Sequence, residues 1–402
     1  MIMNTQSKQT GVTIIELMIA LVIGSVIMVG VGTVYSSSKR SYKTQEEFSR
    51  LQENGRFAMN YIARFVRGAG FSGCASGLDS SSFTNDLNTP NTLEWNFSTG
   101  IEGYEASGTG PGQVLGSALA EYPDASSTAS NWTIGGGATV PLPLATGSAD
   151  SVVPHSDVLV SRSADGAGVE ISKNNSGAQL FLNCTGVDPD GCGSGSPSYS
   201  GLCDGDILLV SDCKKSIAFQ GTNIQITNPG AANCEVNVAH AAGGGPGNAV
   251  TSWGGANPGP ERLFKKGDEM LKVSTKVFYV GKGTNGPALF LKQGNSAGQE
   301  LVEGVETLQV LYGEDTDAAP DNVPNRYVAA DKVVDFSNVV AVRISILLRS
   351  LKELPHRDNT TNTFLLGGTT AASAASITAP TDKRMRRVMS MTIKLRNRAF
   401  SL

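Results

Sequence analysis

The sequence predicts an α+β fold in which a long N-terminal helix packs on an antiparallel sheet and disulfides hold a large insertion of loops and short strands. Three observations predict it. An apolar run of helical length opens the chain, alternating apolar and polar residues recur toward its end, and six cysteines lie between. With 402 residues, 47 glycines and 17% charged residues, the composition favours a loop-rich β protein of one large or two ordinary domains.

The first apolar run covers residues 12–34 and follows a polar leader that ends at Gly11. At about 1.5 Å per residue it is long enough to cross a hydrocarbon core of about 30 Å. Its one ionisable residue is Glu16, and an unpaired carboxylate in hydrocarbon is costly enough to mark a functional position. An ordinary secretory signal cut near Ser38 and a plain membrane anchor are the alternatives.

Gly11, Val12 and the stretch Thr13-Ile-Ile-Glu16-Leu-Met-Ile-Ala resemble the leader of type IV pilins and pseudopilins. The resemblance implies that prepilin peptidase cuts between Gly11 and Val12 and that Val12 is then methylated. It also implies that Glu16 attracts the N-terminal amine of a neighbouring subunit and so sets the axial register of a filament. Val12 stands where the family usually has Phe.

The helix is expected to continue to residue 67, a length of about 80 Å, because residues 35–67 contain no proline. Its first part, 12–34, is apolar on every side and suits lipid or a filament core. Its second part is amphipathic and is expected to pack on a sheet. The apolar stripe consists of Leu51, Gly55, Ala58, Ile62, Phe65 and Ala69.

The residues at the end of the helix resemble one subgroup of the pilins. Asn54-Gly-Arg56 is followed by Arg67-Gly-Ala-Gly-Phe-Ser-Gly-Cys74, which resembles the corresponding turn of PilW-type minor pilins. Residues 299–315, 339–343 and 395–398 extend the resemblance at the other end of the chain. It implies a non-enzymatic minor pilin in type IV pilus assembly, located in the priming or tip complex.

The same resemblance implies where the chain resides and what it binds. It is expected to cross the inner membrane once with its C-terminal domain in the periplasm, and then to enter the pilus. The implied partners are other minor pilins, the major pilin, prepilin peptidase, the inner-membrane assembly platform and the lipid bilayer. A net charge of −4 gives no footprint for nucleic acid, and no cofactor is expected.

The six cysteines are expected to form disulfides, because an even number beyond a membrane span fits an oxidising compartment. No Cys-x-x-Cys pair or histidine spacing supports a metal site. Fifteen pairings are possible. Short loops favour Cys184–Cys192 and Cys203–Cys213, which leaves Cys74–Cys234.

The chain divides into a leader (1–11), the helix (12–67), a Gly- and Ser-rich variable region (68–260) and a C-terminal antiparallel β region (261–402). The variable region is expected to be long loops over a few short strands at 157–161, 179–182, 206–210 and 223–226. In the β region we expect a central strand at 339–348 and an edge strand at 363–366. The other expected strands there are 272–280, 288–291, 305–312 and 387–395.

Three patterns suggest chemistry and are interpreted as structural. Gly294-Asn-Ser296-Ala-Gly298 matches a nucleophile elbow, but a strand rather than a helix is expected after it, so a hairpin turn is predicted. Asp315, Asp317 and Asp321 offer calcium ligands without the EF-hand order, and aspartates also favour turns. The basic C-terminal stretch is expected to meet acidic neighbours such as Glu303 or Glu306 at a subunit contact. It consists of Lys383, Arg384, Arg386, Arg387, Lys394, Arg396 and Arg398.

Two other functions fit the same sequence. A pseudopilin of a type II secretion system shares the leader and the helix. A pilus-tip adhesin would bind a surface or a glycan through residues 76–260. A membrane-anchored enzyme is disfavoured, because no acid, base or metal-binding residues converge in the sequence pattern.

Overall fold

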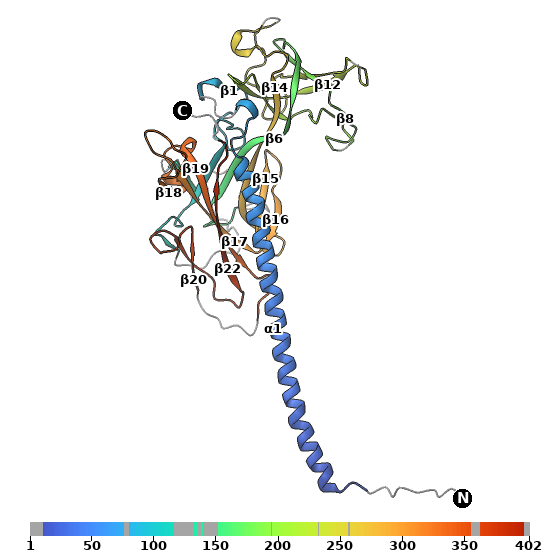
Figure 1. Ribbon diagram of the computed structural model, residues 1–402, viewed down its shortest axis with the longest axis vertical. Coiled ribbons are helices and arrows are strands. Elements are labelled where there is room, and N and C mark those ends of the chain that lie inside the picture. The colour runs from blue at the N-terminus through green and yellow to red at the C-terminus, as the bar shows by residue number, and fades with distance from the viewer. Residues whose placement is uncertain are drawn as a thin grey trace, which may run out of the picture.

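The computed structural model describes residues 11–75, 80–115, 132–135, 138–139, 152–193, 195–231, 233–255, 258–354 and 362–397. One helix, α1 (Ile14–Gly68), runs from the N-terminal end of the molecule into a β-rich part at the other end (Figure 1). The expected helix of residues 12–67 is therefore confirmed, with both ends displaced by one or two residues. The residues buried on α1 are Glu47, Leu51, Gly55, Ala58, Met59, Ile62, Ala63 and Val66.

The large sheet is organised around two long antiparallel strands, β6 (Val158–Lys173) and β14 (Glu269–Gly283). Their register runs from Leu159 opposite Phe278 to Glu170 opposite Glu269, with one irregularity near Met270. The path through the sheet is β1-β11-β10-β14-β6-β2-β4-β5. Its remaining strands are β1 (Phe83–Asn85), β2 (Ile101–Ala106), β4 (Trp132–Ile134), β5 (Ala138–Thr139), β10 (Ile207–Ser211) and β11 (Ser216–Gln220).

Five further strands branch from this path. β15 (Gly286–Gln293) pairs with β14 and β16 (Gln299–Glu303), while β7 (Gln179–Asn183), β13 (Glu235–Ala239) and β12 (Asn223–Thr227) pair in that order from β6. A second sheet has the order β18-β17-β19-β22, and its central strands are β17 (Val305–Glu314) and β19 (Val339–Arg349). Its outer strands are β18 (Arg326–Val328) and β22 (Arg386–Lys394).

Two small sheets complete the fold. One has the order β20-β21-β3, with β20 (Thr363–Leu366), β21 (Ala375–Thr378) and β3 (Val114–Leu115). The other pairs β8 (Val187–Asp188) with β9 (Ser198–Tyr199). The expected central strand is thus β19, between β17 and β22, and the expected edge strand is β20. Both predictions are confirmed.

Two clusters of buried apolar residues define two parts of the molecule, which we call the body and the head. The body is residues 47–68 of α1 together with 277–397, and its core joins α1 to β14–β17, β19 and β22. The head is residues 169–270, and its core is a separate cluster drawn from β6, β7 and β10–β14. The head lies at the end of the molecule opposite the N-terminal end of α1 (Figure 1).

The variable region is more regular than its composition suggests. All four expected strands are present, as parts of β6, β7, β10 and β12. β6, however, runs for 16 residues and pairs along most of β14. The variable region is therefore part of the large sheet and does not consist only of loops beside it. Alternating burial in β7 and β13 explains how short strands with few apolar residues still supply a core.

Candidate functional site: the uncovered helix and its anchored end

The start of α1 is closed by a capping box. Thr13 is the N-cap, and its hydroxyl accepts a hydrogen bond from the Glu16 backbone N–H at 3.3 Å. The Glu16 carboxylate accepts in return from the Thr13 backbone N–H and hydroxyl, both at 2.9 Å. The carboxylate also lies at the positive end of the helix dipole. Glu16 therefore has a local role that the sequence interpretation missed, although the Thr13-x-x-Glu16 spacing signals it.

The first part of α1 has no cover within the chain. Every residue from Gly11 to Lys43 is exposed, and the first buried side chain is that of Glu47. By length and composition this part of the helix could cross a membrane. Exposed large apolar side chains include Ile14, Leu17, Leu21, Ile23, Val26, Ile27 and Val29. Full burial of each is worth about 1.5–3 kcal/mol, so this surface requires lipid or partner helices.

The second part of α1 inserts into the body, and Gly55 of the Asn-Gly-Arg motif marks the closest approach. A Cβ at Gly55 would overlap the Met389 sulfur on β22 and lie 2.9 Å from Cδ1 of Leu348 on β19. Farther along, the Tyr61 and Phe65 rings pack near Phe278 of β14, with centroids 6.3 and 6.0 Å away. The helix is therefore the central element of the body core.

The turn after α1 is fastened to β6. Gly70, with φ of 76°, donates its N–H to the Arg162 carbonyl at 2.8 Å, and Ala164 donates to the Phe71 carbonyl at 2.6 Å. Gly73 also has positive φ, which favours glycine. It brings Cys74 to the turn between β10 and β11, where Cys74 forms a disulfide with Cys213. The Gly-Cys motif thus joins the end of the helix to the base of the head.

All six cysteines are paired, and the pairing expected from loop length is wrong. The disulfides are Cys74–Cys213, Cys184–Cys234 and Cys192–Cys203. Sheet register explains the second one. Asn183 lies opposite Glu235 in the β7–β13 pair, so the next residue on one strand and the preceding residue on the other also face each other. Strand pairing, rather than distance along the chain, decides which cysteines meet.

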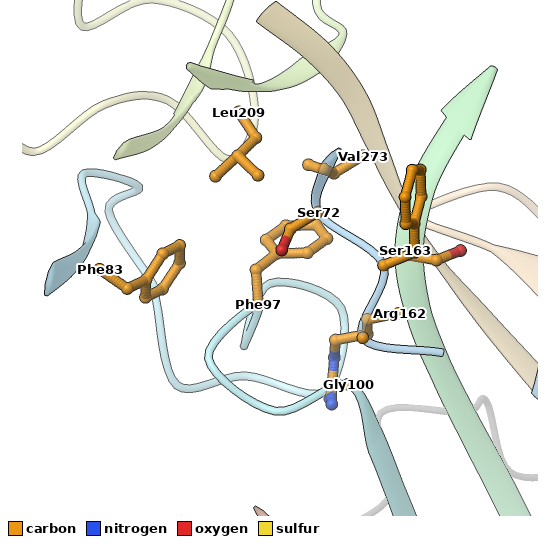
Figure 2. Close-up of a pocket in the computed structure, with 10 residues that line it drawn as sticks. Ser72, Phe83, Phe97, Gly100, Arg162, Ser163, Leu209 and Val273 are labelled. Carbon is orange, nitrogen blue, oxygen red and sulfur yellow. The ribbon is translucent and has the colours of Figure 1, made fainter. Parts of the chain in front are cut away.

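A small cavity lies where the helix end, the loop of residues 83–100 and the two long strands meet. Figure 2 shows Phe83, Phe97 and Leu209 pointing toward this space. Its volume is only about 20 Å³, enough for little more than one water molecule. On one side, the Arg162 guanidinium is held by the Glu102 carboxylate at 2.6 Å and the Leu93 carbonyl at 2.7 Å. The cavity is a packing feature and not a ligand site.

Within the basic C-terminal stretch, Arg386 forms its ion pairs inside the chain. Arg386 forms two hydrogen bonds with Glu306, at 2.7 and 2.8 Å, and two with Asp382, at 2.6 and 2.8 Å. The Arg386 and Glu306 side chains are almost completely buried. The expected acidic neighbour is therefore correct, but the contact joins β22 to β17 within one molecule instead of joining two subunits. Arg398 lies outside the described residues.

The other two patterns behave as turns. Residues 294–298 connect β15 to β16, which confirms the predicted hairpin. Asp315, Asp317 and Asp321 bring one oxygen each within 4.8 Å of one another. The Asp315 carboxylate accepts from the backbone N–H groups of Asp317 and Asn322, and the Asp321 carboxylate accepts from that of Val323. The Asp317 carboxylate accepts from the side-chain amide of Asn325. These bonds account for the aspartates as turn residues.

Two family models match the chain. Residues 277–397 match the model described as type IV pilus-assembly protein W, and residues 6–32 match the prokaryotic N-terminal methylation motif. The first match covers the sheets of the body, and the second spans Gly11, Val12 and Glu16. The resemblance inferred from the sequence is confirmed at both ends of the chain. No curated protein and no solved structure gives a significant match.

Proposed function

Because the chain carries the two family matches of a PilW-type pilin with a prepilin motif, we propose that it is a minor pilin of a type IV pilus. Prepilin peptidase removes residues 1–11, and Val12 becomes the methylated N-terminal residue. Before assembly, residues 12–34 cross the inner membrane and the C-terminal domain lies in the periplasm. The chain has no catalytic role and is itself the substrate of the processing reaction.

The observation that carries this proposal is the contrast along α1. One part is the core of the body, and the other, from Gly11 to Lys43, is exposed throughout. An apolar helix of this length needs a continuous apolar environment. Lipid supplies it before assembly, and the helices of neighbouring pilins supply it afterwards. The same surface therefore explains both locations.

Glu16 is proposed to pair with the N-terminal amine of a neighbouring subunit. In the low-dielectric interior of a helix bundle, the attraction between the carboxylate and the amine offsets much of their desolvation. The capping box offers a competing, local role, and glutamine can replace glutamate in a capping box. Glu16→Gln therefore keeps the cap and removes the charge, while Glu16→Ala removes both.

These two variants test the proposal through pilus assembly. If the charge is needed, both variants fail to restore surface pili and twitching motility to a deletion strain, although both reach the membrane at the parental level. If Glu16→Gln restores pili as well as the parental chain does, the pairing role is wrong and Glu16 acts as a helix cap.

We further propose a place in the priming or tip complex, beside other minor pilins, the major pilin and the assembly platform. The head lies beyond the body at the end opposite the N-terminal end of α1, which supports an end position (Figure 1). Immunogold labelling of the head on sheared pili tests this. Gold at filament ends supports the proposal, and gold spaced along the shaft contradicts it.

A second role, adhesion to a surface or glycan, is favoured by one feature of the head. The β8–β9 hairpin and the Cys192–Cys203 loop are largely exposed and are held by their own disulfide. The test is the variant Cys192→Ser/Cys203→Ser. Pili that contain this variant at the parental level but adhere poorly to surfaces support the role. Unchanged adhesion with a perturbed loop contradicts it.

A further inference from the structure

A cavity of about 450 Å³ opens where β2 and β4 of the large sheet meet β18 of the second sheet. Its walls come from the end of β2, the loop that follows β2, β4, β18 and the short helix Ala330–Lys332. The volume is in the range that holds small organic groups. Several polar side chains line it, namely Glu105, Gln113, Thr133, Tyr327, Asp331 and Lys332.

Glu105 is the deepest charged group that lines the cavity. Its side chain belongs to a residue that is only 5% exposed. One carboxylate oxygen accepts from the Thr109 hydroxyl at 3.3 Å, while the other, Oε2, has no hydrogen-bond partner among the described residues. A buried carboxylate oxygen without a donor is unfavourable, and such groups are uncommon unless a ligand or another function uses them.

A second carboxylate lies behind Glu105. Asp157 accepts from the backbone N–H groups of Ala106 at 2.9 Å and Val310 at 2.8 Å, and so ties β2 to β17. Burial raises the pKa of Asp157 to about 7, although these two donors oppose the change. Burial also raises the pKa of Glu105 well above its usual range, and the negative charges of Asp157 and Asp331 raise it further. The Thr109 hydroxyl and the Ala330 backbone N–H oppose this change.

The outer wall adds one more acid and its own cation. Asp331 pairs with Lys332 at 2.9 Å, and the Lys332 side chain is mostly exposed. Tyr327 lines the same wall, and its ring is covered on one side by the Arg343 guanidinium at 4.2 Å. Glu105 is thus faced by Asp157, Asp331 and Lys332, so negative charge predominates around it.

The spacing of these acids argues against a metal ion. Among the described residues, only Asp315, Asp317 and Asp321 bring three carboxylate oxygens within 4.8 Å of one another. Glu105, Asp157 and Asp331 are therefore too dispersed to ligate one ion together. A cavity of this volume with one buried acceptor instead fits a larger organic cation that carries several N–H donors.

We propose that this cavity binds a protonated amine or guanidinium, such as a lysine or arginine side chain, with Glu105 as its buried acceptor and Asp331 at the entrance. A lysine ammonium or an arginine guanidinium supplies the donor that Oε2 lacks. Burial raises the pKa of Glu105, and a bound cation favours the charged form of its carboxyl, so binding is expected to be coupled to proton release.

The test uses the purified full-length chain in detergent and isothermal titration calorimetry. The probes are N-acetyl-lysine methylamide, cadaverine and, as an uncharged control, N-acetyl-norleucine methylamide. The two cations bind and the norleucine probe does not. A preference for the lysine probe indicates a protein side chain, and a preference for cadaverine indicates a free amine. Absence of binding by both cations at 10 mM, a concentration on the order of 10,000-fold above a micromolar Kd, overturns the proposal.

Variants separate binding from folding. Glu105→Gln weakens binding of the cation at least tenfold and abolishes the buffer-dependent heat of proton release, with an unchanged melting temperature as the folding control. Lys332→Met frees Asp331 and tightens binding about threefold, a gain that a merely structural role would not produce. Asp321→Asn, an acidic residue outside the cavity, leaves affinity unchanged. Parental affinity in Glu105→Gln contradicts the assignment of Glu105.

Discussion

The body and the head reach a folded structure by different means. The body contains no cysteine and is built around α1, whose residues 47–68 fill the space beside β17, β19 and β22. The head contains no part of α1 and holds five of the six cysteines. Four of them form two disulfides within the head, and Cys213 pairs with Cys74. The sixth, Cys74, ties the head to the end of the helix.

This difference matches the division of the sequence. The PilW family match covers the sheets of the body and stops short of the head. A helix that supplies a continuous apolar face constrains the strands against it, whereas disulfides hold a small core with fewer constraints on the loops between them. The family match thus follows the part of the chain that is built on α1.

Removal of the Cys74–Cys213 disulfide is expected to have the largest effect. It closes a loop of 139 residues, whereas Cys192–Cys203 closes one of 11. By chain entropy these loops correspond to about 5 and about 3 kcal/mol. Cys74→Ser/Cys213→Ser should therefore lower the free energy of unfolding of the head more than Cys192→Ser/Cys203→Ser does. Denaturant unfolding of both variants measures the difference, and equal losses would contradict the proposed link between head and helix.

Arg386→Ala tests the body in the same way. It removes the cation shared by Glu306 and Asp382. Glu306, which is almost completely buried, retains Arg349 at 3.7 Å, and Asp382 retains Arg384 at 3.7 Å. Removal of one partner of a buried pair costs about 3–5 kcal/mol. Lys394→Ala, at an exposed position of the same strand, serves as the control and should change stability little. A small effect of Arg386→Ala would show that the ion pairs do not hold β22 to β17.

Gly55→Ala and Gly68→Ala make the same change on the same helix. A Cβ at Gly55 meets the Met389 and Leu348 side chains, while nothing lies within 4 Å of one at Gly68. Overpacking at residue 55 is expected to cost about 1–3 kcal/mol, less the gain in helix propensity. Gly68→Ala is expected to be neutral or stabilising. Thermal unfolding measures both, and a stabilised Gly55→Ala would show that α1 is not tightly seated.

A change of pH is expected to change the stabilities of the head and the body in opposite directions. This is the smallest of the four effects predicted here. His240 is buried in the head, stacks on Trp253 at 4.3 Å, and has no hydrogen-bond partner for either ring nitrogen among the described residues. Burial lowers the pKa of His240, and the nearby Arg262 lowers it further. This contribution to head stability is complete above pH 6.5 and is lost as pH falls from 6.5 through the lower folded pKa.

The body responds with the opposite sign through Asp157, whose carboxylate accepts from the Val310 backbone N–H on β17. Because the pKa of Asp157 is raised to about 7 from an unfolded value near 4, its contribution is complete below pH 4 and is lost as pH rises toward 7. Hydrogen exchange at pH 5 and 7.5, corrected for intrinsic rates, compares β11 and β13 with β17 and β19. Protection should fall in the head and rise in the body at pH 5. His240→Leu should abolish the change in the head alone.

Local patterns predicted much of the fold and little of the candidate sites. Steps of three and four residues placed the buried face of α1, and the apolar run at 339–348 identified the central strand β19, because both depend on neighbours along the chain. The disulfides depend on strand register, which the pairing of β7 with β13 sets and local loop length does not.

The two buried charged groups, around Arg386 and around Glu105, depend on long-range packing and could not be predicted from the sequence. Arg386 was expected to meet an acid on another subunit, but β17 and β22 flank β19 and bring Glu306 to it within one chain. Glu105 and Asp157 lie 52 positions apart in stretches without a recognisable spacing. They meet because β2 pairs with β6 in the register that places Tyr104 opposite Val158. Carboxylates in such stretches carry no signal in the sequence itself.

The central claim is that the uncovered helix begins at a processed N-terminus and serves a filament. Intact mass and N-terminal sequencing of the protein from cells with and without prepilin peptidase test it most directly. The account predicts a chain that begins at Val12, with the mass of one added methyl group, only when the peptidase is present. An uncut chain, or a cut near Ser38 in both strains, would contradict it and leave an anchored or secreted β-rich protein.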